Sequence, residues 1–485
     1  YKAICDRSEI VFLDSQTRSE ETGFQANAQM GKLIHGILGW EKLIPESMAM
    51  YQSPMPTFRV ASRPVPEARM WMVEGFAGTI QPWWHHVSAY HEDRRQYETA
   101  PPLLQWHAEH EAALVDREPV ATVGVVWSQE NVDFFGREAP RERVLTPYWG
   151  AVQALIRDRI PYQPVHADHI LRDAAQLSLL ILPNVGALSD AQCAAIRDFV
   201  AGGGGLLASG ISSLYDENGE PRDDFALADL FGAHATGEHR GAWGRSDPSW
   251  DAYQYHSYLR LKPELRAQVD GPHLGSEPPV AEASRHPVLG GFEKTDLLPF
   301  GGRLEVVEAA ESTEIPATWI PPFPIYPPEF AWMREQDSGL PALLLNERTG
   351  GGRVAYMPSA LDVCYGRDAL PDHGRLLANL VRWAARDAIP LQVEGHGLLD
   401  CQIYRQGARL VLHLVNLNHE GAWRAPLHAL TPIGPLRVSV QLPAGLRVSE
   451  ARCLVADEVA AIEVSDRWGA FDVSEIVDHE VIVLE

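Results

Sequence analysis

The chain has 485 residues, more than one hydrophobic core usually spans, so we expect two to four domains. Hydrophobic residues make up 45% and charged residues 22% of the sequence, a balance typical of globular proteins rather than disordered or fibrous ones. With 41 basic and 65 acidic residues the net charge is −24, which argues against binding to nucleic acid or to an anionic membrane.

The five cysteines are scattered along the chain, odd in number and without CxxC spacing, so they predict neither a disulfide framework nor a zinc site. This usage favours a reducing compartment, and we expect a cytoplasmic protein. No apolar run is long enough for a membrane span, and no signal peptide is evident. The chain begins with Tyr1 and reaches an apolar segment within ten residues, which suggests the middle of a longer protein.

The first 118 residues alternate between short apolar runs and helical patterns, which is typical of a parallel α/β sheet. The predicted strands are residues 8–14, 42–46 and 79–86, and the predicted helices are residues 25–38 and 66–77. Gly39 and Gly78 follow the two helices, as expected at helix C-termini.

This stretch resembles the end of the catalytic (β/α)8 barrel of family-42 β-galactosidases. Asp14 after an apolar strand, then Ile44-Pro-Glu46, look like the sixth and seventh barrel strands, and residues 63–78 look like the helix leading to the eighth. The resemblance implies that Glu46 is the nucleophile and that Trp83-Trp84 takes the place of an aromatic wall of the sugar site. Family members usually carry Met-Glu-Gln where this chain has Pro-Glu-Ser, which leaves the sugar specificity open.

Glycoside hydrolysis of the retaining kind uses a nucleophilic carboxylate and an acid/base carboxylate about 5–5.5 Å apart. Barrel active sites lie at the C-terminal ends of the strands, where we expect the candidates to converge. The catalytic candidates are Glu46 and Asp14, and the expected substrate-binding residues are Trp83, Trp84, His85, His86, Tyr51 and Arg59. The alternative for Glu46 is a structural role, either capping a loop or pairing with Arg59 or Arg63. Glu74 lies in mid-helix and is interpreted as structural.

No metal and no cofactor are expected. The adjacent His85 and His86 would face opposite sides of a strand, which is unfavourable for a shared metal. The 14 tryptophans fit either sugar stacking or an ordinary core and interface role.

Three strands cannot close an eight-stranded barrel, which needs about 250 residues with its helices. By the resemblance, the acid/base glutamate also lies outside this chain. We therefore expect the missing barrel segment upstream or on another chain, with a catalytically inactive relic as the alternative.

Residues 119–391 show a second α/β pattern, with buried strands at 119–127, 177–183 and 206–208 and helices at 147–159 and 375–386. Ser189 to Gln192 matches a capping box that opens a further helix. Residues 202–205 are four glycines that follow a helix and precede a strand, the reverse of a phosphate loop, so they predict a turn.

This region resembles the trimerisation domain of family-42 β-galactosidases, which has an amidotransferase-like, flavodoxin-type fold. The segments that carry the likeness are residues 180–184, 199–207 and 351–356. An amidotransferase would carry a cysteine at the turn after the strand, but residues 183–186 contain none, and the spacing of Cys193 with Ile196 and Val200 predicts a core residue. An amidotransferase- or hydrolase-like enzyme is thus a second alternative.

Residues 233–335 are expected to be an insertion, and the proline-rich segment 321–329 an extended loop that either reaches a neighbouring subunit or acts as a spacer. From residue 392 the period changes to two, with strands at 408–415, 436–442 and 481–484 that predict an antiparallel β-sandwich. The predicted domains are therefore 1–118, 119–391 and 392–485. The resemblance implies a glycosidase of carbohydrate substrates that assembles as a homotrimer, and the alternative is an inactive sugar-binding or assembly protein.

Overall fold

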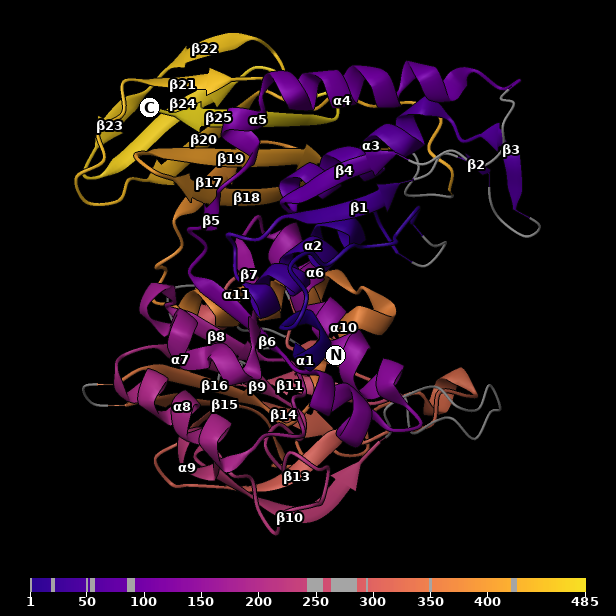
Figure 1. The fold of residues 1–485 in the computed structure, drawn as a ribbon. Helices are drawn as coiled ribbons and strands as arrows, with labels where there is room; N and C mark the ends of the chain where they lie inside the picture. The colour runs from indigo at the N-terminus through magenta and orange to yellow at the C-terminus, as the bar shows by residue number, and fades with distance from the viewer. Residues whose placement is uncertain are drawn as a thin grey trace. The chain divides into compact units, whose positions relative to one another are not determined.

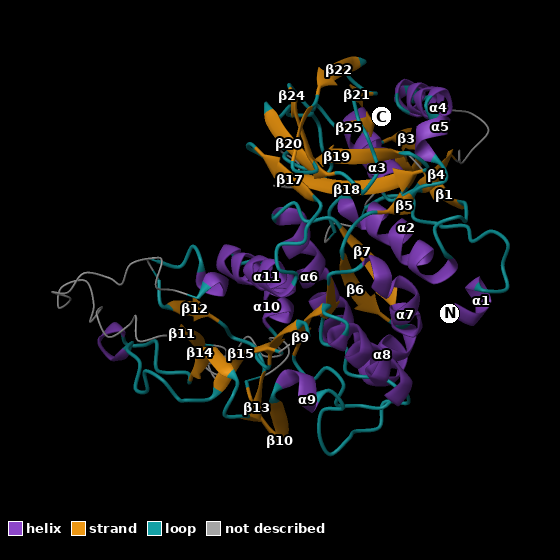
Figure 2. Cartoon of the chain, turned by 90° about the vertical axis from the view of Figure 1, so that its left-hand side faces the viewer, coloured by secondary structure: helices purple, strands orange, loops and turns teal. Residues whose placement is uncertain are grey.

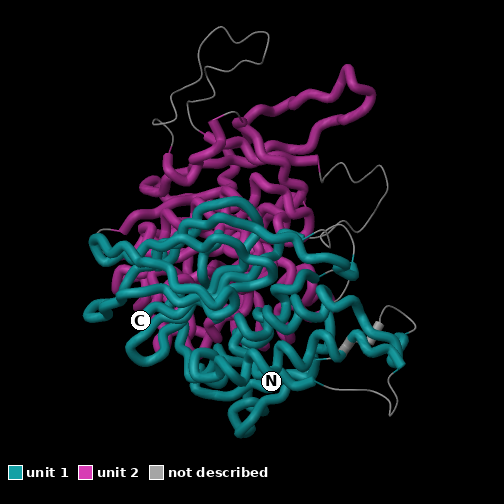
Figure 3. Tube along the Cα trace, turned by 90° about the horizontal axis from the view of Figure 1, so that it is seen from above, with its two compact units in different colours: residues 1–121, 159–164, 389–485 teal, residues 122–158, 165–388 magenta. Residues whose placement is uncertain are grey.

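The computed structural model describes residues 2–18, 22–48, 51–52, 57–84, 92–241, 256–262, 286–293, 295–348, 351–419 and 425–485, with the backbone alone at 51, 52 and 96. The chain forms two compact units. The first contains residues 1–121, 159–164 and 389–485, and the second contains residues 122–158 and 165–388 (Figure 3). The three-domain division stays a prediction.

The N-terminal part of the first unit is built on parallel pairing. β1 (Ile44–Met48) pairs in parallel with β4 (Ile80–Trp84), and Leu13 forms a single parallel bridge with Glu46 on the other side of β1. The predicted strand over residues 8–14 is therefore wrong except at Leu13. Ile10 and Phe12 are exposed, and no described strand pairs with the outer edge of this segment.

Two helices join these parallel segments, as predicted. α2 (Gln25–Leu38) has the predicted bounds, and α3 (Val65–Ala77) begins one residue earlier than expected. Gly39 ends α2 with φ at 104°, and its N–H donates to His35 O at 2.8 Å. The helices approach closely: a Cβ at Gly78 would lie 2.5 Å from Ala28 Cα, so only glycine fits there.

The C-terminal part of the first unit consists of two antiparallel sheets over one apolar core. The four-stranded sheet has the order β17 (Leu391–Glu394), β20 (Leu436–Gln441), β24 (Trp468–Val473) and β23 (Glu463–Ser465). The six-stranded sheet has the order β22 (Glu458–Ala461), β21 (Glu450–Cys453), β25 (His479–Leu484), β19 (Arg409–Asn416), β18 (Leu399–Gln406) and β5 (Glu118–Pro119). In Figure 1 the strands from β17 to β25 run from orange to yellow, and the purple β5 lies alongside β18.

Helices cover the outer face of the six-stranded sheet. Phe76 of α3 shares a core with Val415 of β19, and Leu114 of α5 (Glu111–Leu114) packs against Val411 and Val481. α4 (Ala100–Glu109) adds Leu103 to the same layer. Both faces of this sheet are therefore buried, which places the polar residues of its outer face in the interior.

The second unit is built on a nine-stranded mixed sheet, although residues 162–164 of the last strand in its order count with the first unit. Its order is β12 (Leu297–Pro299), β11 (Tyr258–Leu261), β14 (Glu314–Ile320), β15 (Pro341–Glu347), β16 (Arg353–Met357), β9 (Gly205–Ser209), β8 (Leu179–Leu182), β6 (Val123–Trp127) and β7 (Tyr162–His166). β16, β9, β8 and β6 are parallel, whereas the strands from β15 to β12 are antiparallel.

Helices flank the parallel strands on both sides. Figure 2 shows α6 (Thr146–Arg157), α10 (Leu361–Asp368) and α11 (Pro371–Ala384) on one side, and α7 (Ile170–Asp173) and α8 (Asp190–Ala201) on the other. The predicted capping box is confirmed, because Gln192 N donates to Ser189 Oγ at 3.2 Å and Ser189 N donates to Gln192 Oε1 at 2.9 Å.

The strands of the predicted insertion include β10 (Ala233–Arg240) and β13 (Leu304–Ala309), which pair with each other, and α9 (Ala228–Phe231) precedes them. The expected irregular loop holds no strand, but a short 3-10 turn spans Pro328–Phe330. All five cysteines are free and buried. Among the described residues, no helix combines the length and apolar character needed to cross a bilayer.

Candidate active site

Glu46 lies at the centre of β1, on the face of the strand that α2 and α3 cover. A Cβ at Gly75 of α3 would lie 2.8 Å from Met48 Cε and 3.7 Å from Glu46 Oε2, so both side chains point toward this helix. Glu46 is fully buried, and neither carboxylate oxygen has a hydrogen-bond partner among the described residues. The carboxyl group is thus enclosed between strand and helices.

Burial controls the protonation of Glu46. Loss of hydration raises the pKa of this carboxyl to about 8; the neighbouring Asn27 amide offsets part of the rise, and the negative charge of Asp14 adds to it. At neutral pH Glu46 is therefore mainly protonated in this arrangement. A neutral carboxylic acid is a proton donor, whereas a glycosidase nucleophile must be ionised.

Trp83 lies on the opposite, open face of the same sheet. Trp83 is 51% exposed, and its ring contacts Phe12 edge-on, with 5.2 Å between ring centroids. Asp14, two residues after Phe12, is also exposed and accepts a hydrogen bond from Gln16 Nε2 at 2.8 Å. The structure therefore brings Phe12 and Trp83 into contact and leaves the Asp14 carboxylate exposed.

We expected the side chains of Glu46, Asp14 and Trp83 to converge at the strand ends, but the structure does not bring Glu46 together with the other two. Glu46 pairs with Leu13 on one side and with Pro82 on the other, so the three parallel segments are in register at this point. The side chain of Glu46, however, leaves the sheet on the helix side, because it shares the register of the core residues Ile44 and Met48.

Trp84 shares the covered face with Glu46. It packs against the core that contains Met48 and Phe76. Only one of the two adjacent tryptophans, Trp83, is therefore available on the open face, as strand alternation predicts.

The structure says less about the other residues that were expected to bind the substrate. Arg59 is exposed on β3 (Phe58–Ser62), which pairs with β2 (Tyr51–Gln52). For Tyr51 the structure describes the backbone but no side chain, and His85 and His86 lie outside the described residues.

The arginine pairing expected in the structural alternative for Glu46 is wrong. Glu46 forms no ion pair with Arg59 or Arg63. Arg63 instead donates to Glu67 Oε1 at 3.2 Å, and Arg18 donates to both oxygens of Glu67 at 2.7 Å. Glu67 of α3, rather than Glu46, therefore pairs with these two arginines, and it is itself buried.

Sequence reasoning missed a buried polar cluster in the first unit. Lys32 of α2 donates to Gln402 Oε1 at 2.8 Å, and its ammonium lies 3.3 Å from the centroid of the Tyr162 ring. Gln402 Nε2 donates to Asp400 Oδ1 at 2.5 Å, while both oxygens of Glu74 lack a partner among the described residues. Burial lowers the pKa of Lys32 to about 7, and burial raises the pKa of both Glu74 and Asp400.

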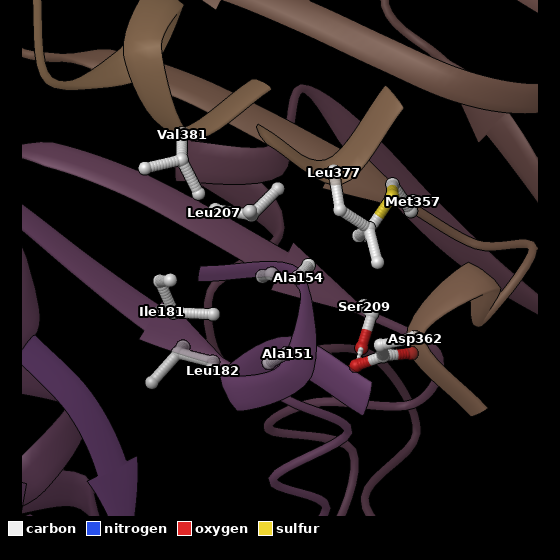
Figure 4. A pocket seen from close by; sticks show the side chains of 11 residues that line it. Ala151, Ala154, Ile181, Leu182, Leu207, Ser209, Met357, Asp362, Leu377 and Val381 are labelled. Atoms are coloured by element: carbon white, nitrogen blue, oxygen red, sulfur yellow. Dashed lines mark hydrogen bonds between the residues drawn. The ribbon is translucent and has the colours of Figure 1, made fainter. Parts of the chain in front are cut away.

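The turn after β8, where an amidotransferase would carry its cysteine, contacts Ser209 of β9, since Asn184 N donates to Ser209 Oγ at 2.9 Å. Ser209 Oγ donates to the buried Asp362 Oδ2 at 2.5 Å beside an enclosed cavity of about 10 Å³, room for at most one water molecule (Figure 4). Its remaining lining is apolar, from strands β8, β9 and β16 and helices α6 and α11. Cys193 of α8 packs in the apolar core and does not line this cavity, and burial raises the pKa of its thiol to about 11, which disfavours the reactive thiolate.

Within the described ranges, no group of three or more His, Cys, Asp or Glu side chains is arranged to hold a metal ion.

The chain is similar to known proteins in its fold rather than in its sequence. Neither a protein-family model nor a curated protein sequence matches this chain. The fold is similar to a β-galactosidase from Bacillus circulans sp. alkalophilus, with a TM-score of 0.68, 15% identity and coverage of 100% of this chain and 61% of that one. It is also similar to a catalytic mutant of a GH42 β-galactosidase from G. stearothermophilus (TM-score 0.63, 12% identity, 100% and 60% coverage). A third similar structure is α-L-fucosidase isoenzyme 2 from Paenibacillus thiaminolyticus (TM-score 0.66, 17% identity, 92% and 60% coverage).

These likenesses bear out the family-42-like resemblance at the level of the fold, over the whole length of the chain. The chain spans about three-fifths of the length of each of these three proteins.

Proposed function

We propose that this chain is the C-terminal part of a glycoside hydrolase that cleaves β-linked, galactoside-like sugars by a retaining mechanism, with Glu46 as the nucleophile. The observation that carries the proposal is the place of Glu46 on the middle one of three parallel segments, flanked by Leu13 and Pro82. This is the order implied by the resemblance to family-42 enzymes, and the fold likeness over the whole chain supports it.

The open face of the parallel segments supports a larger barrel. Phe12, Trp83 and Ile10 expose 48%, 51% and 63% of their surface, which is unusual for neighbouring large apolar side chains. We infer that the remaining barrel strands, from an upstream segment or another chain, enclose this open face and bring the acid/base carboxylate. Asp14 and Trp83 then contribute to the sugar site from the open face.

Catalysis by Glu46 requires the completed barrel to change its environment. Its carboxyl must ionise and reach the open face, whereas it is protonated under the helices here. A positive or hydrogen-bond-donating group supplied by the missing segment would lower its pKa, because it stabilises the charged form.

A second candidate is a sugar-binding or assembly protein without catalysis. The specific observation in its favour is the same burial of Glu46, since an enclosed neutral acid cannot attack an anomeric carbon. The two candidates differ in one consequence: only the enzyme loses activity when Glu46 is replaced.

Turnover of a nitrophenyl β-galactoside by the complete protein tests the proposal. Glu46→Gln should lower kcat by several orders of magnitude, because the covalent route is removed. The control Glu98→Gln changes an exposed glutamate of the same unit and should retain activity. Near-normal kcat in Glu46→Gln refutes the nucleophile, and an inactive complete wild type supports the second candidate.

For assembly, we propose a homotrimer in which the loop at residues 321–329 contacts a neighbour. Tyr326, Phe330 and Trp332 in and after this loop expose 58%, 54% and 56% of their surface, and aromatic residues are enriched at protein interfaces. In a closed ring of three subunits each loop would be buried against a neighbour, and no subunit would have an unpaired interface.

A further inference from the structure

A cavity of about 360 Å³ lies in the first unit where the residues after α2 meet β5 and β18. Its lining side chains are Trp40, Glu41, Asp116, Arg117, Glu118 and Arg405. The volume falls within the range of about 300–1,000 Å³ that small-molecule sites occupy. None of the proposed catalytic or sugar-site residues lines it.

The rim of this cavity offers free acceptors. The side chains of Glu41, Asp116 and Glu118 are exposed, and none forms a hydrogen bond or ion pair with another described residue. Glu118 and Arg405 are paired in the backbone ladder between β5 and β18, but their charged groups form no ion pair in the described part of the chain. Arg405 Nε donates to Gly407 O at 3.1 Å, which leaves its other donors for a ligand.

Behind the rim lies a buried positive charge. Arg117 is 3% exposed; it contacts His413 Nε2, donates to Phe76 O at 3.1 Å and lies over the Tyr404 ring at 5.0 Å. Its Nε has no partner, and no carboxylate pairs with it among the described residues. A buried guanidinium without a counter-charge is costly unless something else compensates it.

Trp40 supplies an aromatic wall. One side of the ring is stacked on His35 at 4.8 Å with 6° between the planes, and Tyr404 lies 6.0 Å away at a tilt. These neighbours hold the indole in place while it lines the cavity. An immobilised aromatic ring binds flat apolar surfaces at little entropic cost.

The charged side chains that line the cavity favour one class of ligand. Three carboxylates repel an anion, and two guanidinium groups repel a cation. A neutral molecule rich in hydroxyl groups can donate to the carboxylates and accept from Arg405, because each hydroxyl is both donor and acceptor. The flat C–H face of a pyranose ring also suits Trp40. We propose that this cavity is a saccharide-binding site separate from the proposed catalytic site.

Saturation-transfer NMR on the 485-residue chain tests this assignment, with methyl β-galactopyranoside and methyl β-glucopyranoside as probes and with acetate, methylammonium and glycerol as comparisons. We expect saturation transfer to at least one pyranoside and none to the two ions. Trp40→Ala should weaken pyranoside binding about threefold or more. Asp116→Asn/Glu118→Gln alters only exposed side chains, so it tests the site even if Trp40→Ala does not fold.

The control variants separate this site from the other proposals. Trp83→Ala and Glu46→Gln should leave pyranoside binding at this cavity unchanged, so a failure of the catalytic proposal does not affect the result. The assignment is overturned if no pyranoside binds, if the Asp116→Asn/Glu118→Gln variant binds like the wild type, or if Trp83→Ala alone abolishes all binding.

Discussion

Glu46 and Trp83 are neighbours across the pairing of β1 with β4, yet their side chains leave the sheet on opposite faces. Glu46 pairs with Pro82 and points under α3, whereas Trp83 pairs with Ser47 and points to the open face. The nucleophile candidate and the aromatic candidate are thus separated by the thickness of one sheet.

Replacing Glu46 should stabilise the isolated 485-residue chain above neutral pH. Its folded pKa of about 8 lies above the unfolded value, so the unfolded state releases its proton first as pH rises. The free energy of unfolding should therefore fall between about pH 4.5 and 8, by about 1.4 kcal/mol for each unit of pKa difference. In Glu46→Gln this fall should disappear. At pH 8 the free energy of unfolding of the variant should therefore exceed that of the wild type by about 2 kcal/mol or more.

Urea unfolding of both proteins at pH 5 and pH 8 checks this effect. Glu98→Gln, an exposed replacement, should follow the wild type at both pH values. Equal pH dependence in Glu46→Gln and wild type would show that Glu46 is ionised and solvated in the folded chain.

The two adjacent tryptophans should respond differently to truncation. Trp84→Ala removes a ring from the core shared with Met48 and Phe76, so it should lower the unfolding free energy by about 2 kcal/mol or more. Trp83→Ala should cost less than about 1 kcal/mol in stability but weaken sugar binding by the complete protein by about 1 kcal/mol. Thermal unfolding and a binding titration measure the two effects, and equal losses in both variants contradict the assigned faces.

The buried lysine cluster should behave as a coupled unit. Lys32→Met leaves Asp400 and Glu74 without their positive neighbour, so we expect a loss of about 3 kcal/mol in unfolding free energy. Adding Asp400→Asn should recover part of this loss, because one buried negative charge is removed with its partner. The matched control is Lys2→Met, which breaks the exposed Lys2–Asp6 pair and should change stability by less than about 1 kcal/mol. Additive losses in the double variant would mean that the two charges do not interact.

The proposed trimer predicts a mass near three subunits for the complete protein at micromolar concentration. Light scattering measures it directly. Replacing Phe330 and Trp332 by serine should shift the mass toward one subunit without loss of secondary structure, since both side chains are exposed within one chain. A single-subunit mass for the wild type rules the trimer out.

Local signals in the sequence predicted the helices well. The apolar spacing and Gly39 gave α2 its bounds, and the Ser189–Gln192 pattern gave the start of α8. Both signals are local, since the residues that end or cap a helix lie within a few positions of it. The segment at 8–14 failed because an apolar run forms a strand only where a partner strand pairs with it.

The site was harder to predict than the elements. Alternation showed that Trp83 and Trp84 face opposite sides, but not which side the helices cover, and that side determines the burial of Glu46. The contact of Lys32 with Gln402 joins residues 370 positions apart, so no local pattern could indicate it. Glu74, interpreted as structural from its mid-helix position, belongs to this same cluster.

Covalent trapping of the complete protein tests the central claim most directly. A 2-deoxy-2-fluoro-β-galactoside with a good leaving group slows hydrolysis of the glycosyl-enzyme, so a retaining enzyme accumulates the ester on its nucleophile. Peptide mapping by mass spectrometry should locate one fluorosugar on Glu46, and Glu46→Gln should remain unlabelled. A fluorosugar on another carboxylate, or an active complete enzyme that never becomes labelled, would contradict the account.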